Sequence, residues 1–449
     1  MTVTNWTATF ANLVAQSLPN DEAITSAQKG VLDYLASSLT AGQTATGTLL
    51  MRWFDEEGGH ADVPLIGMYK KVSARQAAFF NGYLGHALDL DDVHTDVRGH
   101  PSTVILPALL SVAATGSYSG RRFLEAYVVG VEVMARLGLA IGSKHYTKGW
   151  HNTATLGGIA AACACAYLQK FSAEKTELSI GLAATQSSGM RNQFGTEVKP
   201  LHAGFAAEQG YVATKLTELG LVGSNDTLDG ENGFLTLYGD GTEFANTLTS
   251  SWGESWKIST PGLWFKIYPF CSAAFHAADA CQELLNQYTL TLEDIQMIEV
   301  IYPPKGDAAL IHTHPQTGDE GRFSVEYIVG LFLTKRTATL SDFTHEAIPS
   351  SIRNVMNKVT RQYDVTIKPS PHAVPKGRFT IVRIHLENGT ILKSRVDAPF
   401  GSTDKPLSMG QLEQKLNDGC SEVQANHIKQ AVHDLDKAST LNELIDAIR

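Results

Sequence analysis

The stretch TLGGIAAACACAYLQ, residues 155–169, consists largely of alanine, glycine and other small side chains. Stretches of similar character occupy residues 123–142 and 203–220. Small side chains let neighbouring helix axes approach closely, and helices with few charged positions belong in a protein interior. These three segments therefore predict a bundle of closely packed helices with a well-buried interior.

The helical pattern extends from the start of the chain to about residue 260. Residues 21–42 place apolar side chains close to helical spacing and end at Gly42, which is a typical stop signal. Ser73, followed by Gln76 three positions later, has the spacing of a capping box that starts a further helix. We therefore expect the first half of the chain to be helical.

The composition changes after about residue 265. Residues 297–304, MIEVIYPP, are rich in β-branched side chains and end in two prolines. Residues 379–397 alternate apolar and polar positions around Asn388-Gly389, the strongest short-range signal for a β-hairpin. Helical patterns lie between these strands, at residues 323–333 and 350–360. This part of the chain predicts a smaller α/β module.

The C-terminal segment is helical again, with Ser408 and Gln411 spaced as a second capping box. We expect these helices to return to the first domain. The predicted fold class is mostly α with an α+β part. A large all-helical domain is built from both chain ends, residues 1–264 and 405–449, and a smaller α/β domain from residues 265–404.

The overall composition fits a globular protein with more than one core. Of its 449 residues, 43% are hydrophobic and 18% are charged. The net charge of −10 and the lack of a Lys/Arg-rich stripe argue against nucleic acid as a partner. Apolar runs are interrupted well before the roughly 20 residues that a membrane span needs. Because the five cysteines form no CxxC pair and no signal-peptide pattern is present, we expect a cytoplasmic location.

Residues 86–102, HALDLDDVHTDVRGHPS, concentrate three histidines and four aspartates in one short run. The preceding helix is expected to end near Val93. On such a helix His86, Asp89 and Asp92 share one face, because residues three apart are neighbours on a helix surface. This arrangement would bring a histidine and two carboxylates together.

The second half of this run is expected to be a loop that carries His94 and Asp96. His100 follows it, beside Pro101, which suits the first turn of the next helix. The N–H groups at that helix start favour an anion. The run is therefore suited to proton transfer on a carboxylate substrate. The same residue types also ligate divalent metal ions, or form helix caps and surface ion pairs, so these alternatives stay open.

Three further segments carry candidate residues. His151 directly precedes an Ala- and Gly-rich helix, where it is either an active-site histidine or incidental to a helix cap. Lys199 is either an anchor for a carboxylate or a solvated loop lysine. Lys266 is the only charge in a long apolar run, so it either reaches towards water or faces an anionic ligand in an interdomain cleft. For Cys271, in the same run, buried packing is the better interpretation. No P-loop, GxGxxG or GxSxG motif indicates a nucleotide, a flavin or a serine nucleophile.

Six motifs follow one another along the chain: HALDLDDVH with GHPS, HNTATLG, KPLHAGFAAEQG, KIYPFCSAAFHA, GRFSVEYIVGLFL and NGTILKSRVDAPFGSTDKPLSMGQLEQKL. In this order they resemble the MmgE/PrpD family, whose members include 2-methylcitrate dehydratase, cis-aconitate decarboxylase and iminodisuccinate epimerase. The resemblance covers nearly the whole chain. It implies a helical domain capped by an α/β lid, a homodimer, and a site in the cleft between the domains.

The resemblance also implies which residues form that site. The catalytic residues would be Asp89, His100, His151, Lys199, Lys266 and Tyr327. The residues that bind substrate would be His94, Arg191, His202 and Cys271. Two lysines and a helix N-terminus can balance the charge of a small polycarboxylate, while a histidine acts as base or acid. The family's chemistry needs no organic cofactor and generally no metal, so we expect neither.

The resemblance implies several reactions, of which we expect dehydration of a 2-methylcitrate-like substrate first, because it is the family's commonest assignment. In cis-aconitate decarboxylases a histidine follows the lid lysine by five residues, whereas this chain has Cys271 there. The HPS motif continues with Thr103, unlike the HPSD pattern of methylcitrate dehydratases. An iminodisuccinate-type epimerase and a cis-aconitate decarboxylase are therefore alternatives. A metal-dependent hydrolase and a non-catalytic carboxylate-binding protein are alternatives from other classes.

Overall fold

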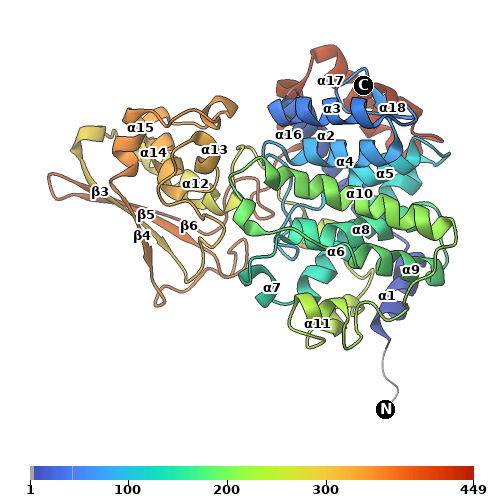
Figure 1. Cartoon of the computed structure of the whole chain (residues 1–449). Helices are drawn as coiled ribbons and strands as arrows, with labels where there is room; N and C mark the ends of the chain where they lie inside the picture. The colour runs from blue at the N-terminus through green and yellow to red at the C-terminus, as the bar shows by residue number, and fades with distance from the viewer. Residues whose placement is uncertain (1–4, 43) are drawn as a thin grey trace.

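The computed structural model describes residues 5–42 and 44–449. It consists of a large helical part and a smaller part that contains a β-sheet (Figure 1). The predicted fold class, mostly α with an α+β part, is confirmed.

The helical part contains segments from both ends of the chain. The first group is α1 (Trp6–Ala15), α2 (Asp21–Ala41), α3 (Ala45–Glu57), α4 (Ala74–His86), α5 (Ser102–Ala113), α6 (Gly120–Ala140), α7 (Lys144–Thr147), α8 (Asn152–Leu168), α9 (Ala173–Ala184), α10 (Val198–Glu218) and α11 (Phe234–Tyr238). The second group is α16 (Met409–Gly419), α17 (Glu422–His433) and α18 (Asn442–Ala447). A short ribbon of β1 (Val63–Pro64) and β2 (Lys71–Val72) lies against α4. The C-terminal helices return to the N-terminal ones, since α16 packs along α2 (Figure 1).

Helix α8 lies at the centre of this bundle. All of its residues are buried, and it packs against α5, α6, α9 and α10. The packing depends on small side chains, because a Cβ atom added at Gly210 of α10 would lie 2.4 Å from the Cβ atom of Ala161. The Ala- and Gly-rich stretches thus form the interior of the bundle.

Local signals set several helix ends. Helix α2 ends where Gly42 adopts a φ of 45°. The predicted capping boxes are present at the starts of α4, with Ser73 and Gln76, and of α16, with Ser408 and Gln411. Each box joins a side-chain acceptor to an otherwise unpaired backbone N–H group at the helix start.

The smaller part, which we call the lid, is a mixed sheet with helices packed on it. The strands are ordered β4–β3–β5–β6, with β3 and β4 parallel and the other pairs antiparallel. The predicted hairpin is formed by β5 and β6, and Gly389 in its turn has a φ of 82°. The lid elements are α12 (Phe275–Gln287), β3 (Ile295–Tyr302), α13 (Gly318–Gly321), α14 (Val325–Lys335), α15 (Ser350–Met356), β4 (Val359–Tyr363), β5 (Thr380–Leu386) and β6 (Ile391–Val396).

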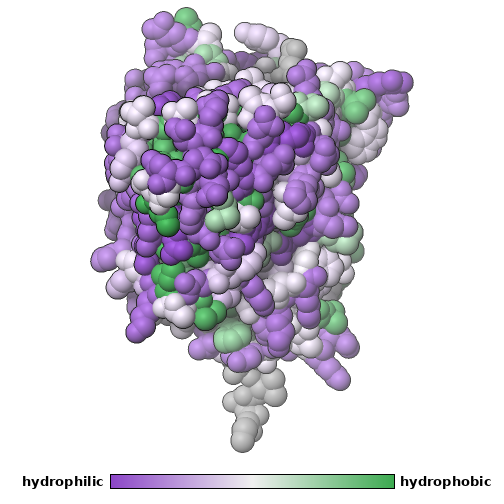
Figure 2. All heavy atoms as spheres, turned by 90° about the vertical axis from the view of Figure 1, so that its left-hand side faces the viewer, coloured by the Kyte–Doolittle hydropathy of each residue, from purple (hydrophilic) through white to green (hydrophobic). Residues whose placement is uncertain are grey.

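The outer face of the lid is mainly hydrophilic, with isolated apolar residues (Figure 2). Exposed apolar side chains of the lid include Tyr363, Val365 and Ile391. Most apolar side chains of the lid face α12, α14 and the sheet interior instead, where they form a core of their own.

The two large hydrophobic cores of the described residues lie in the two parts of the molecule, and a small third cluster is formed by Ile301, Phe379 and Ile381. One large core lies among the helices, and the other lies in the lid and includes Val93 and Trp264. Val93 and Trp264 also pair through backbone hydrogen bonds, which tie the loop after α4 to the start of the lid. The domain boundaries at residues 265 and 405 stay a prediction. Within residues 5–42 and 44–449, no helix is both long and apolar enough to cross a membrane.

Candidate active site

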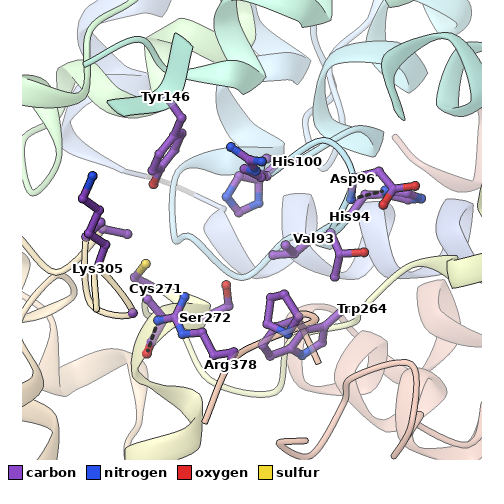
Figure 3. Close-up of a pocket in the computed structure, with 18 of the residues that line it drawn as sticks. Val93, His94, Asp96, His100, Tyr146, Trp264, Cys271, Ser272, Lys305 and Arg378 are labelled. Carbon is purple, nitrogen blue, oxygen red and sulfur yellow. Dashed lines mark hydrogen bonds between the residues drawn. The ribbon is translucent and has the colours of Figure 1, made fainter. Parts of the chain in front are cut away.

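A cavity of about 680 Å³ lies between the helical part and the lid (Figure 3). Its helical wall includes the loop of residues 93–100. Its lid wall includes residues 271–273, 303–306 and 375–378. Such a cleft between two cores is a preferred place for a small-molecule site.

Residues 87–92, which precede this wall, form a loop and not the continuous helix that the sequence predicted. Helix α4 ends at His86, not near Val93, and Asp89 adopts a φ of 53°. Asp91 meets His86 as a result, with Nδ1 of His86 2.8 Å from a carboxylate oxygen. Asp92, which was expected to share a face with His86, instead turns towards the start of α5. The physical reason is that tertiary contacts hold this loop, because Lys266 donates to the carbonyl oxygen of Asp89 at 2.8 Å.

Asp89 is the centre of the charged cluster. The ammonium groups of Lys199 and Lys266 each lie 2.8 Å from its Oδ1 atom. Burial opposes ionisation of Asp89, but the two lysines outweigh this effect and hold its pKa well below the ordinary value. Its other oxygen, Oδ2, is buried and has no hydrogen-bond partner among the described residues. Oδ2 is therefore a strong acceptor that the described residues leave unsatisfied.

His100 presents an unprotonated nitrogen to this cluster. Its Nδ1 atom lies 2.8 Å from the carbonyl oxygen of Asp92 and 3.3 Å from the carboxylate of Asp91. Because a carbonyl oxygen only accepts, Nδ1 carries the proton and Nε2 of the neutral ring has a free lone pair. Nε2 lies 3.7 Å from Oδ1 of Asp89. Burial lowers the pKa of His100 well below its ordinary value, although Asp91 opposes this, so the ring is neutral at pH 7.

His151 forms a pair with His202. Their Nδ1 atoms are 3.1 Å apart, so one ring donates to the other. Burial, with Lys199 and His202 nearby, lowers the pKa of His151 well below its ordinary value. Burial also lowers the pKa of His202 to about 4. Only His151 of this pair lines the cavity. His202 contacts the His151 ring and does not line the cavity itself.

The start of α5 is occupied by the protein's own carboxylate. The backbone N–H group of Ser102 lies 3.3 Å from Oδ1 of Asp92, and the Ser102 hydroxyl also donates to Asp92. Burial, reinforced by Asp33, raises the pKa of Asp92 well above its ordinary value. The N–H group of Ser102 at this helix end was expected to bind a substrate carboxylate. It binds the Asp92 side chain instead.

The remaining predicted residues lie in different places. His94 lines the cavity edge, but its ring nitrogens bond to the Lys257 carbonyl at 2.9 Å and to the Asp96 N–H group at 3.2 Å. Cys271 also lines the cavity, and burial raises the pKa of its thiol. Lys266 is fully buried and reaches the cluster through Asp89.

Arg191 and Tyr327 do not line the cavity. The Arg191 guanidinium stacks on the Tyr146 ring, 3.9 Å from its centroid, and donates to the Tyr146 carbonyl at 2.8 Å. The Tyr327 hydroxyl donates to the carbonyl oxygen of Asp342 inside the lid. Both side chains are held by the protein itself, so neither is free to bind substrate directly.

Several residues of the neighbourhood were not among the predicted site residues. His86 and Asp91 belong to the histidine- and aspartate-rich run. Their contact was not predicted, because on a continuous helix the two side chains would not share a face. Tyr146 and Arg378 line the cavity as well. Neither belongs to one of the six motifs, so the sequence offered no direct signal for them.

His86, Asp89, Asp91 and His100 bring potential ligand atoms within 4.8 Å of one another. These residue types suit a divalent metal ion. Asp89 favours a different interpretation, because its Oδ1 atom already accepts from the ammonium groups of Lys199 and Lys266. Two ammonium groups on Asp89 would also repel a further cation. The cluster therefore fits a protonated hydrogen-bond network better than a metal centre.

Comparison with known proteins assigns the family. The MmgE/PrpD N-terminal domain matches residues 6–247, and the MmgE/PrpD C-terminal domain matches residues 268–440. The chain belongs to the MmgE/PrpD family. The resemblance predicted from the six motifs is confirmed.

This MmgE/PrpD protein is similar to several cis-aconitate decarboxylases. It is 26% identical to the cis-aconitate decarboxylase-like protein oryM of Aspergillus oryzae, over 99% of this chain and 97% of that protein. It is 28% identical to the human cis-aconitate decarboxylase, over 77% of this chain and 73% of that protein. For the Aspergillus terreus cis-aconitate decarboxylase the identity is 25%, over 86% and 83%.

Proposed function

We propose that this MmgE/PrpD protein is a lyase that moves a proton at a carbon next to a carboxylate of a small polycarboxylic acid. The observation that carries the proposal is the position of the unprotonated Nε2 atom of His100. It lies 3.7 Å from the Asp89 oxygen on which the Lys199 and Lys266 ammonium groups converge. A neutral base beside concentrated positive charge suits deprotonation of a weak carbon acid.

The two lysines would stabilise the charge that develops in the reaction. Removal of a proton next to a carboxylate places negative charge on the carboxylate oxygens. Lys199 and Lys266 are already fixed by Asp89, so they need little reorganisation when that charge forms. The unpartnered Oδ2 atom of Asp89 would accept a hydrogen bond from a substrate hydroxyl.

His151 is the second proton-transfer group in this proposal. We assign the proton between the paired Nδ1 atoms to His202, which then donates to His151. His151 carries its own proton on Nε2 in this tautomer, at the ring edge away from His202. It can then protonate a leaving group while His100 accepts the proton from carbon.

Dehydration, as in a 2-methylcitrate dehydratase, follows from these roles. His100 takes a proton from the carbon next to a carboxylate, and a C=C bond forms. The C–O bond of the neighbouring hydroxyl group breaks with its electron pair on oxygen. His151 protonates that oxygen, and water leaves.

Decarboxylation is the second candidate, and the names of the similar proteins favour it. A C–C bond breaks to release CO₂, and the carbon that keeps the electron pair takes a proton from the Nε2–H group of His151. In cis-aconitate decarboxylases the family resemblance implies a histidine five residues after the lid lysine. This chain has Cys271 at that position, which argues against decarboxylation. An iminodisuccinate-type epimerase would use the same base and acid on opposite faces of one carbon.

The alternatives from other classes make different predictions. A metal-dependent hydrolase would require a divalent ion at the cluster of His86, Asp89, Asp91 and His100. A carboxylate-binding protein without activity would bind polycarboxylates and leave them unchanged. A homodimer and a cytoplasmic location stay predictions.

Proton NMR in D₂O with a chelator present tests the proposal. The panel is 2-methylcitrate, citrate, cis-aconitate, iminodisuccinate and tartrate. We expect at least one acid to show deuterium next to a carboxylate, a new vinyl signal, or, where the new double bond carries no hydrogen as with 2-methylcitrate, collapse of the methyl doublet to a singlet. His100→Gln should abolish the change. Lys335→Met, which removes a lid lysine bound to Asp342 away from the cavity, should not.

The outcomes separate the candidate functions. Loss of water identifies a dehydratase, loss of CO₂ a decarboxylase, and exchange without net loss an epimerase. Turnover that appears only after a divalent metal is added would assign the cluster to a metal ion and overturn the proposal. Binding without exchange for every acid would favour a non-catalytic protein.

A further inference from the structure

The far side of the cavity has no part in the Asp89 cluster. It is formed by the lid residues 303–306 and 375–378, together with Tyr146 from α7. Figure 3 shows Tyr146, Lys305, Cys271 and Arg378 on one side of the cavity. His94, Asp96 and Trp264 lie on the other side, so the far side is a distinct region of the same cavity.

Arg378 has no counter-ion within residues 5–42 and 44–449. Its Nη2 atom donates to the carbonyl oxygen of Ala273 at 3.2 Å, and its buried Nε atom has no hydrogen-bond partner among the described residues. No carboxylate of the described residues lies within ion-pair distance of the Arg378 guanidinium. Asp307, an acid that influences it, is instead bound to Arg361 at 2.9 Å and to Tyr363 at 2.8 Å. A partly buried guanidinium with five donors is therefore mostly unsatisfied.

Three further cationic side chains line the same cavity as Arg378. Arg98, Lys305 and Lys376 also line the cavity and form no ion pair within the described ranges. The two acids of the lining are both neutralised, Asp89 by two lysines and Asp96 by Lys257 at 2.7 Å. The cavity is thus cationic in a chain whose net charge is −10, and low-dielectric walls strengthen this field.

Tyr146 is oriented towards the same region. Its ring is stacked on Arg191, 3.9 Å from the guanidinium carbon to the ring centroid, and this contact fixes the ring plane. Figure 3 shows its hydroxyl directed into the cavity. Burial raises the pKa of Tyr146, although the positive charges of Arg191 and, less strongly, Arg378 oppose this. The hydroxyl therefore stays protonated and can donate a hydrogen bond.

We propose that Arg378 and Tyr146 form a second carboxylate subsite, which binds the carboxylate of the substrate that is farthest from the reacting carbon. The planar guanidinium matches a carboxylate with two parallel hydrogen bonds, and the Tyr146 hydroxyl adds a third. The subsite selects tricarboxylates over dicarboxylates. It rests on the proposed function, in which the carboxylate next to the reacting carbon lies near Lys199.

The test measures binding rather than turnover. Propane-1,2,3-tricarboxylate and methylsuccinate differ by one terminal carboxylate, and neither carries a leaving hydroxyl group. Calorimetric titration of the full-length protein with both acids gives a ratio of dissociation constants. We expect the wild type to bind the tricarboxylate at least about tenfold more tightly, as a charged hydrogen-bonded pair supports.

Arg378→Gln should weaken tricarboxylate binding by about tenfold and leave methylsuccinate binding within about twofold, so that the ratio collapses. Tyr146→Phe should reduce the ratio by a smaller factor. Arg378→Lys keeps the charge but not the planar fork, and it should retain part of the ratio. The matched control is Arg383→Gln, which removes a lid arginine that pairs with Glu299 outside the cavity and should not change the ratio.

The proposal is overturned if the wild type does not discriminate between the acids or binds neither. It is also overturned if Arg378→Gln weakens both acids equally, because that result indicates a general electrostatic or structural role. A collapsed ratio in a protein that turns over none of the five acids would support the subsite and contradict the proposed reaction. Turnover with an unchanged ratio would support the reaction and contradict the subsite.

Discussion

Nδ1 of His100 lies 2.8 Å from the carbonyl oxygen of Asp92, a contact that leaves Nε2 as the acceptor nitrogen of the neutral ring. The two residues are brought together by the turn that follows α4. This contact supports the base assigned to the site, because it determines which nitrogen has the lone pair.

His100→Gln is expected to lower kcat by at least about a hundredfold, since general base catalysis contributes factors of 10²–10⁴. Glutamine can still donate to the Asp92 carbonyl, so the loop should keep its structure and KM should change little. Initial rates and the far-ultraviolet circular dichroism spectrum check both statements. A rate within tenfold of wild type would remove His100 from the mechanism.

The pH dependence should show the depressed pKa of His100. Protonation of Nε2 destroys the base, so kcat/KM falls on the acid side. Because burial lowers the pKa of His100, the midpoint of this fall should lie below the ordinary histidine value of about 6.5. Asp89 stays ionised throughout this range, because the nearby lysines hold its pKa well below the ordinary value despite its burial.

A pH–rate profile, corrected for the separately titrated ionisation of the substrate, measures the midpoint. A plateau from pH 8 to about 6.5 agrees with a neutral buried base. A midpoint at or above that value would indicate that the titrating base is solvated, which does not fit His100.

Local signals in the sequence predicted much of the fold. Gly42, the two capping boxes and the turn at Gly389 act within a few residues, and the structure has each of them where the pattern indicated. The loop around Asp89 could not be predicted in this way. Its positive φ is stabilised by Lys266, 177 positions later in the chain, and no local pattern carries that contact.

The two lysines on Asp89 provide a second test. Lys266→Met is expected to lower kcat/KM by about a hundredfold or more, because preorganised charge at developing oxyanions contributes factors of this size. Methionine suits the fully buried, apolar position, so the helical circular dichroism should be retained. The comparison is with Lys335→Met, a lid lysine that pairs with Asp342 outside the cavity. Equal rates for the two variants would show that Lys266 has only a structural role.

Lys415 links the C-terminal helix α16 to the loop that carries the site. Its ammonium group lies 2.6 Å from Oδ1 of Asp33 and 2.7 Å from the carbonyl oxygen of Leu90. Both side chains of the ion pair are buried. Removal of one partner from such a pair leaves a charge without compensation in the interior.

Lys415→Met is therefore expected to lower the free energy of unfolding by about 3–5 kcal/mol, measured by urea denaturation followed by circular dichroism. Adding Asp33→Asn should restore part of this loss, because a neutral amide needs no cation. Lys429→Met is the control, since this lysine bonds to Asn417 at the surface and its removal should cost less than about 1 kcal/mol. If Lys415→Met and Lys429→Met are equally stable, the buried pair does not hold α16 against α2, and the loop after α4 is positioned by its other contacts, among them those with Lys266 and Trp264.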